Sequence, residues 1–175
     1  MTREAGFTLT ELMVTLTIVA ILMGIGVPSY KYVTNSDRVS SEINGLLGDL
    51  QFARAEAIRE GQTVTVCPAA DTTYSNCAMT GTTWNTGWIV TTNLHGTDNV
   101  LRVQQSFNSK DTMTSDITVA AVVFNREGFA PTLGGPTAFT LKDSTANANY
   151  TRCLTVQVTG LMATATHTSD PTNCN

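Results

Sequence analysis

Four cysteines are the side chains in this sequence best suited to covalent chemistry. They are Cys67, Cys77, Cys153 and Cys174. Paired thiols form disulfides in an oxidising compartment, whereas metal-binding cysteines usually occur as C-x-x-C pairs with further ligands at fixed spacing. The sequence has no C-x-x-C pair, and neither His95 nor His167 stands at a ligand spacing from a cysteine. The even count therefore favours two disulfides and no metal site.

Four cysteines allow three disulfide pairings. Cys67 ends an alternating segment, and the turn-rich residues 69–76 can bring Cys77 back beside it. Cys153 begins a predicted hairpin, and the tail beyond that hairpin can return Cys174 to its start. We expect the pairs Cys67–Cys77 and Cys153–Cys174, each closing a short loop that contributes about 3 kcal/mol in the chain-entropy model. The crossed and nested pairings stay open, because they need only that the two cysteine neighbourhoods converge.

No arrangement of residues in the sequence is typical of an active site. The G-x-S-x-G, H-E-x-x-H, P-loop and Rossmann patterns are all missing, and the two histidines stand in surface-like contexts. The formal net charge is −4, whereas a general electrostatic grip on nucleic acid or anionic lipid needs clustered Lys and Arg. The sequence therefore predicts neither an enzyme nor a bound cofactor.

The N-terminal region is the most apolar part of the chain. Residues 12–27 carry no charge, and a helix over residues 7–27 rises about 31 Å at about 1.5 Å per residue. That length matches a hydrocarbon core of about 30 Å. Arg3 precedes the segment, so the N-terminus is expected on the cytoplasmic side. A cleaved signal peptide fits less well, because its apolar region is shorter and ends at a small-residue cleavage site that is missing here.

One acidic residue, Glu11, lies inside this apolar segment. A plain transmembrane anchor remains the alternative by hydropathy, but an unpaired carboxylate in a membrane is costly. The stretch Gly6-Phe7-Thr8-Leu9-Thr10-Glu11-Leu12, followed by the apolar run, resembles the processing and assembly signature of type IV pilins and type II secretion pseudopilins.

This resemblance implies three roles for these residues. A prepilin peptidase would cut between Gly6 and Phe7 and remove residues 1–6, and Phe7 would then be N-methylated. Glu11 would pair with the N-terminal amine of a neighbouring subunit. Such a pairing makes physical sense, because a buried charge is tolerated when it meets an opposite charge.

A second helical segment follows the membrane segment. Two glycines and a proline within residues 24–28 predict a kink or a melted turn. Ser36 and Asp37 are possible N-caps for an amphipathic helix over residues 36–60, and Gly61 supplies a stop. Its apolar stripe, which we expect to pack on a sheet, consists of Ile43, Leu46, Leu47, Leu50, Ala53, Ala57 and Ile58.

After Gly61 the apolar pattern changes from the period of a helix to the period of a strand. The strand candidates are residues 63–67, 87–92, 100–107, 117–124, 138–141, 153–158 and 161–166. One long helix followed only by strands predicts an α+β, pilin-like fold with an antiparallel sheet wrapped on the helix. The expected parts are a leader over residues 1–6, a membrane half over 7–28 and a periplasmic head over 29–175. Within the head, residues 62–175 are β-rich.

The head has a narrower resemblance that covers nearly the whole chain. The segments that carry it are residues 53–61, residues 64–68, Trp84 with residues 87–90, residues 124–128, and residues 152–156 with Gly160. Their order is similar to that of GspH/FimT/FimU-type minor pilins and pseudopilins. We expect Trp84 and Trp88 to be core aromatics and Gly128 to serve a turn.

Three functions compete within this resemblance. Some FimT-like relatives bind DNA through a C-terminal Gly-Arg-x-Arg element, but here residues 160–163 read Gly-Leu-Met-Ala, and no Lys or Arg follows Arg152. Phosphate contacts supply most non-specific DNA affinity, so a DNA-binding site is not expected. The favoured function is a minor pilin that helps to initiate and connect a type IV pilus. The alternative is a GspH-like pseudopilin of a type II secretion system.

The resemblance also implies partners and a location. The partners would be other major and minor pilins or pseudopilins, the prepilin peptidase and an inner-membrane assembly platform. The subunit would wait in the bacterial inner membrane with its head in the periplasm, where the cysteines can oxidise. It would then enter the pilus or pseudopilus.

Overall fold

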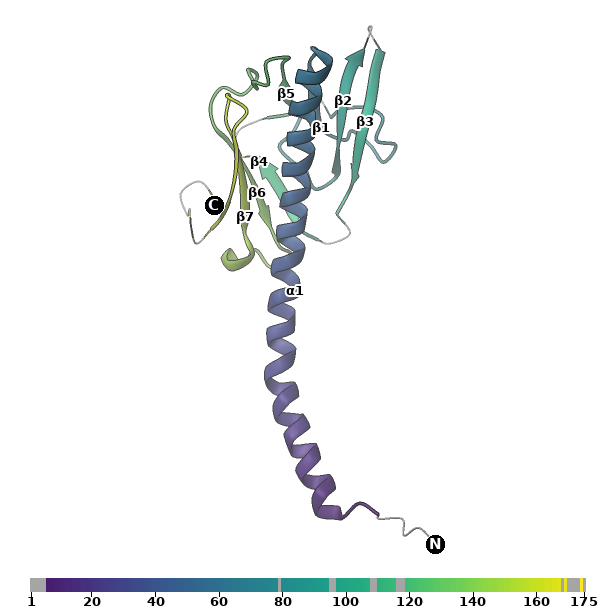
Figure 1. Cartoon of the computed structure of the whole chain (residues 1–175), viewed down its shortest axis with the longest axis vertical. Helices are drawn as coiled ribbons and strands as arrows, with labels where there is room; N and C mark the ends of the chain where they lie inside the picture. The colour runs from purple at the N-terminus through teal and green to yellow at the C-terminus, as the bar shows by residue number, and fades with distance from the viewer. Residues whose placement is uncertain are drawn as a thin grey trace. The chain divides into compact units, whose positions relative to one another are not determined.

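A single long helix, α1 (Leu9–Glu60), forms the N-terminal part of this computed structural model (Figure 1). Its start is capped by Thr8, whose hydroxyl accepts a hydrogen bond from the N–H of Glu11 at 3.3 Å. Within the apolar segment, Thr15 and Thr17 donate their hydroxyls to carbonyls one turn back, at 2.9 and 2.8 Å. Neither threonine therefore leaves an unbonded hydroxyl in the apolar helix.

The helix is continuous where the sequence predicted a melted turn and a second N-terminus. Glycine at positions 24 and 26 lowers helix propensity by about 1 kcal/mol each but keeps its backbone donor. A single proline at position 28 removes one hydrogen bond, which is too little to end a helix of 52 residues. The expected N-caps Ser36 and Asp37 are interior helical residues, so that prediction was wrong.

The structure describes residues 6–78, 80–94, 97–107, 110–115, 119–167, 169 and 174, and it leaves aside the side chains of residues 28, 93, 94, 97 and 98. His95 and the start of the predicted strand at residues 117–124 lie outside these ranges. By its internal contacts the chain forms two units, Met1–Asp37 and Arg38–Asn175. We refer to the second unit as the head.

The described residues of the head form two four-stranded antiparallel sheets, where the sequence predicted one. The first has the order β3-β2-β1-β5 and is built from β1 (Val64–Pro68), β2 (Gly87–Leu94), β3 (Thr97–Gln105) and β5 (Val122–Phe124). The second has the order β4-β6-β7-β8 and is built from β4 (Thr112–Ser115), β6 (Thr137–Lys142), β7 (Arg152–Val156) and β8 (Met162–Thr166). A short 3-10 helix, η1 (Ala148–Tyr150), leads into β7.

Strand β4 was missed because it carries a single apolar side chain, Met113, between polar neighbours. That side chain is fully buried, and β4 pairs with β6 over its whole length. Strand β5 is shorter than predicted and begins at Val122. In both places pairing within a sheet, and not local composition, determines where the strand lies.

The core of the head lies between the later turns of α1 and the two sheets, which flank the helix in Figure 1. The buried helix residues are Val39, Ile43, Leu46, Leu50, Ala53 and Ala57. Trp84 and Trp88 are fully buried, as the sequence predicted, and Trp84 meets Phe139 edge-on at 4.9 Å between ring centroids. Ile58, which the sequence placed on the buried stripe, is instead exposed.

Candidate functional site

The N-terminal half of α1 presents an apolar surface that no other described residue covers. Every described side chain from Gly6 to Val27 is exposed. Among the described residues one helix, α1, is long and apolar enough to cross a membrane, with a mean hydropathy of 2.1 in its most apolar window. A helix that is apolar all round is stable only in lipid or against other apolar helices. This half of α1 is therefore suited to a membrane and to helix packing.

The residues of the predicted processing site lie at the start of this helix. Gly6 and Phe7 precede the first helical residue, and both are exposed. Glu11 lies in the first turn, where a carboxylate interacts favourably with the helix dipole. The structure therefore places Gly6 and Phe7 just before α1 and Glu11 in its first turn.

Arg38 attaches the beginning of the head's helix to the second sheet. Its guanidinium makes a two-pronged ion pair with Asp111, with Nε–Oδ2 at 2.8 Å and Nη2–Oδ1 at 3.0 Å. The Asp111 side chain is fully buried, and it also accepts the N–H of Ser144 at 3.2 Å. The hydrogen bond from Arg38 to this carboxylate raises the pKa of the arginine above its ordinary value. This pair fixes the segment before β4 against the helix.

Asp49 attaches the helix to the first sheet. Its carboxylate accepts a hydrogen bond from the indole N–H of Trp88 at 2.9 Å and another from the guanidinium of Arg102 at 3.1 Å. The same guanidinium lies over the Phe52 ring, 3.9 Å from its centroid. One carboxylate therefore holds β2 and β3 in position against α1.

Arg54 joins the helix to two turns that are distant in the sequence. Its Nε donates to the carbonyl of Gly128 at 3.0 Å, and its Nη1 donates to the carbonyl of Gly160 at 2.9 Å. Both glycines have positive φ, at 80° and 75°. A Cβ on Gly160 would lie 2.3 Å from the carbonyl oxygen of Gly128. The turns are therefore stacked so closely that only glycine fits.

The structure contains the two disulfides expected from the sequence, Cys67–Cys77 and Cys153–Cys174. The first closes the loop that follows β1, where Ala78 donates to the carbonyl of Pro68 at 2.8 Å. The second joins β7 to Cys174 near the C-terminus, and both of its cysteines are buried. Each disulfide thus joins a cysteine outside the named strands, Cys77 or Cys174, to a strand of one sheet.

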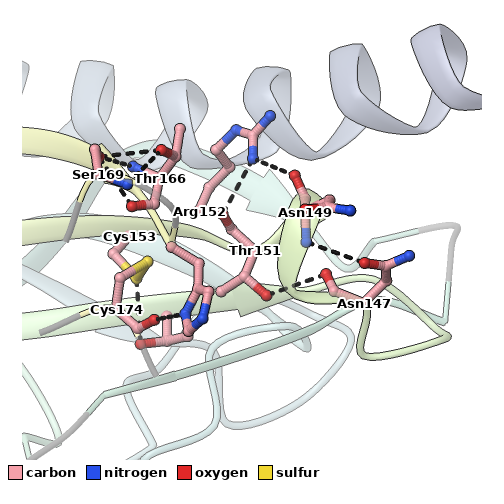
Figure 2. The surroundings of a disulfide bond; sticks show 10 residues. Asn147, Asn149, Thr151, Arg152, Cys153, Thr166, Ser169 and Cys174 are labelled. Carbon is pink, nitrogen blue, oxygen red and sulfur yellow. Dashed lines mark hydrogen bonds between the residues drawn. A yellow bond between two sulfur atoms is a disulfide. The ribbon is translucent and has the colours of Figure 1, made fainter. Parts of the chain in front are cut away.

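Figure 2 shows how β7 uses its two faces around the second disulfide. Arg152 points toward α1, where its Nε donates to the hydroxyl of Ser40 at 3.3 Å. The same guanidinium donates to the carbonyls of Asn149 and Thr151 at 3.0 and 3.1 Å. Cys153 is the next residue along the strand, so its side chain lies on the opposite face. One strand therefore links the helix on one side to the C-terminal tail on the other.

In the described ranges no three His, Cys, Asp or Glu side chains lie close enough to hold a metal ion. The ring of His167 hydrogen-bonds to the carbonyl of Cys174, which gives it a role in holding the tail. The sequence did not predict the contacts that four charged residues make between the helix and the sheets, namely those of Arg38, Asp49, Arg54 and Arg152. For the three on α1, the signal in the sequence was a charged residue close to the stripe of small and apolar helix residues.

Two family models match this chain. The model described as "Type II transport protein GspH" matches residues 42–160, and the model described as "Prokaryotic N-terminal methylation motif" matches residues 1–27. A comparison with curated protein sequences finds no match.

Two solved structures are similar in fold, and both are crystal forms of the type IV minor pilin FimU of Pseudomonas aeruginosa. The form in space group P21 has a TM-score of 0.62 at 18% identity, covering 79% of this chain and 96% of that chain. The form in space group P65 has a TM-score of 0.56 at 16% identity, covering 81% and 98%. At these identities the similarity shows the pilin-like α+β fold.

The family follows from the extent of these matches. The GspH model spans most of the head, and the methylation motif spans the apolar start of α1. The proteins of this family are structural subunits and not enzymes. The chain belongs to the GspH family of type IV pilin-like proteins, which comprises minor pilins and pseudopilins.

Proposed function

We propose that this chain is a minor pilin that helps to initiate and connect a type IV pilus. The observation that supports this most is the combination of an uncovered apolar helix half with a head similar to FimU along almost all of the FimU chain. The helix supplies an insertion and packing element, and the head supplies a surface that neighbouring heads can contact. Arg38, Asp49 and Arg54 fix the later turns of α1 to both sheets, so force on that part of the helix is transmitted to the whole head.

The maturation chemistry follows from the start of the chain. A prepilin peptidase removes residues 1–6 by cutting between Gly6 and Phe7, and the new amine of Phe7 is methylated. Glu11 then pairs with the N-terminal amine of a neighbouring subunit. This pairing is supported by the exposed position of Glu11 in an otherwise uncharged helix turn, because burial between helices without a partner would be costly.

The location follows from the same parts. Residues 7–28 hold the precursor in the inner membrane, and residues 29–175 lie in the periplasm, where disulfides form. The subunit then leaves the membrane for the filament, in which other pilins cover the apolar helix. Its partners are major and minor pilins, the prepilin peptidase and the assembly platform.

A second candidate is a minor pseudopilin of a type II secretion system. The description of the matching family model as a type II transport protein favours it. The two functions share the processing site, the helix and the fold, so these features support them equally.

A deletion strain separates the two candidates. Loss of the gene is expected to reduce surface pili and to leave secretion of type II substrates unchanged, and expression of the wild-type chain should restore piliation. Unchanged piliation together with lost secretion would instead identify the pseudopilin. Expression of a Glu11→Ala chain in the same strain serves as the control. If it restores less piliation than the wild-type chain, the phenotype is connected to assembly.

A further inference from the structure

The sheets formed by the described residues of the head have four outer strands, and three of them are closed to a further strand. Strand β5 is only three residues long, and β3 pairs with β2 through a register shift and carries the exposed Arg102. The outer edge of β4 is covered, because Met113 accepts the N–H of Trp84 at 2.8 Å. Ser115 also donates its N–H to the carbonyl of Thr82 at 3.0 Å. Short strands, bulges, charges and covering segments are the usual protections of a sheet edge.

The fourth outer strand, β8, lacks these protections in the described part of the chain. It ends the second sheet and is drawn in yellow in Figure 1. Its sequence, Met-Ala-Thr-Ala-Thr, has neither a charge nor a proline, and it pairs with β7 along its whole length without a register shift. None of its five side chains is buried. An edge of this kind can hydrogen-bond to another extended backbone.

The pairing of β8 with β7 shows which backbone groups face outward. Gln157 donates its N–H to the carbonyl of Leu161 at 2.9 Å, just beyond the end of the ladder. Hydrogen-bonded pairs alternate with non-bonded pairs in an antiparallel ladder. The N–H and C=O groups of Met162, Thr164 and Thr166 therefore point away from β7.

Ser169 occupies the outer edge at the far end of β8. The N–H of Thr166 donates to the Ser169 hydroxyl at 3.0 Å, and the N–H of Ser169 donates to the carbonyl of Thr166 at 3.0 Å (Figure 2). For Met162 and Thr164, no described residue bonds to the outward N–H or C=O. Each of these two residues thus offers one donor and one acceptor at the spacing of a β-strand, which only another extended backbone matches.

Arg54 gives one end of this edge a positive charge. Arg54 and Met162 line a hollow of about 370 Å³ between α1 and β8, and the described residues that line it include no carboxylate. The guanidinium donates to the neutral carbonyls of Gly128 and Gly160, and within the described ranges it forms no ion pair. A segment added to β8 is therefore complementary in charge when it carries a carboxylate beside Met162.

We propose that the outer edge of β8 binds an extended, acidic peptide segment of a partner protein, which adds a further strand to the second sheet. All strand pairs of this sheet are antiparallel, and the peptide runs antiparallel to β8 in the same way. Its backbone bonds to Met162 and Thr164. Because directly opposed residues share a face, the peptide residue opposite Met162 directs its carboxylate toward Arg54. The inference goes beyond the proposed function and does not rest on it.

A second copy of this chain fits the edge less well. Residues 152–169, which include β7, β8 and the segment after them, contain no Asp or Glu. Edge-to-edge pairing of two β8 strands would therefore supply no carboxylate from these strands for Arg54, and it would bring a second Arg54 to the same interface. The partner is therefore a different segment that has its own acidic residue.

Amide hydrogen exchange of the purified full-length chain in detergent micelles tests the proposal directly. The probe is the capped peptide TSTVTEV, in which serine, the central valine and glutamate lie on one face. We expect it to slow the exchange of the Met162 and Thr164 amides at least about tenfold. Ala163 and Ala165 bond to β7 and should exchange slowly with or without the peptide.

Two results of this measurement would overturn the proposal. One is unchanged exchange of Met162 and Thr164 at the highest soluble concentration of the peptide. The other is slow exchange of these amides without peptide that strengthens with the concentration of the chain, because it would identify a second copy as the occupant.

Modified peptides separate backbone pairing from charge. N-methyl groups on the central valine and the glutamate block the N–H groups that face β8, and they should raise the dissociation constant at least about tenfold. N-methyl groups on the second and third threonines face away from β8, so this matched control should bind within about twofold of the parent peptide. Replacing glutamate by glutamine should weaken binding about fivefold. Equal binding by the two N-methylated peptides, or by the glutamate and glutamine peptides, would overturn the proposal.

The change Thr164→Pro tests the same edge from the side of the protein. Proline removes the outward N–H but leaves the bonds between β7 and β8, which come from the neighbouring positions. We expect it to weaken binding of TSTVTEV at least about tenfold, whereas Thr164→Val keeps the N–H and should bind within about twofold of wild type. Equal melting temperatures exclude misfolding, and if the proline variant melts lower, the N-methylated peptides on the wild-type chain decide. Wild-type affinity of a folded Thr164→Pro chain would overturn the proposal.

The same titration distinguishes this inference from the proposed function. A wild-type chain that binds TSTVTEV but enters no filament would contradict the proposed function and support the peptide site. A wild-type chain that enters filaments but leaves the Met162 and Thr164 amides unprotected at all peptide concentrations would support the proposed function and overturn the peptide site.

Discussion

Arg54 on α1 donates a hydrogen bond to the carbonyl oxygen of Gly160, a residue 106 positions further along the chain, at 2.9 Å. The same guanidinium bonds to Gly128, 74 positions away. Carbonyl oxygens at turns have few partners within their own turn, and a planar guanidinium can serve two of them at once. One helix residue therefore fixes the β5–β6 connection and the β7–β8 turn in a single arrangement.

Removing this guanidinium should destabilise the head. We expect Arg54→Ala to lower the free energy of unfolding by about 2–4 kcal/mol, because the carbonyls of Gly128 and Gly160 lose a charged donor. Arg54→Lys should lose less, since it keeps the charge but cannot serve both turns. Urea unfolding of residues 38–175 measures both variants. An Arg54→Ala head with the wild-type midpoint would contradict this role.

The ion pair of Arg38 and Asp111 predicts an asymmetric pair of mutational effects. Arg38→Ala should cost about 3–5 kcal/mol, because it leaves the fully buried Asp111 carboxylate without its counter-ion. Asp111→Ala is expected to cost less, because the Arg38 side chain that it leaves behind is partly exposed and can be hydrated, although the N–H of Ser144 also loses its acceptor. Thermal unfolding of the oxidised head gives both values. Equal and small losses would show that the pair contributes little.

Much of this fold could be predicted from the sequence, and the exceptions have physical causes. Cys67 and Cys77 are close in the sequence, so local turn chemistry indicated their pairing. Strand β4 and the contacts of Arg54 depend on residues far apart in the chain, which local patterns do not report. The sequence predicted a break in α1 because glycine and proline have low helix propensity near residues 24–28. The cooperativity of a long helix outweighs that local preference, so α1 stays unbroken.

The second disulfide should stabilise the head and hold its tail. Changing both Cys153 and Cys174 to Ser is expected to lower stability by about 2–4 kcal/mol in the chain-entropy model. Peptide mapping without reductant should recover Cys67 joined to Cys77 and Cys153 joined to Cys174. A peptide that joins Cys67 to Cys153 or to Cys174 would show that the periplasmic protein has another pairing.

Glu11 should matter for assembly and not for folding of the head. It lies in the first turn of α1, in the unit that precedes the head. Glu11→Ala is therefore expected to leave the melting temperature of the head unchanged and to reduce the amount of the chain in filaments. Quantitative immunoblots of filament and membrane fractions compare the two proteins. Equal filament content for wild type and variant would rule out the proposed charge pairing.

Mass spectrometry of the chain in sheared surface filaments tests whether it is a processed minor pilin. We expect the protein to be present there in small amounts, with N-methylated Phe7 as its first residue. A Gly6→Val variant should remain uncut in the membrane and be missing from the same filaments. A filament preparation that lacks the wild-type chain, or contains it with Met1 retained, would contradict the claim that it is a processed minor pilin.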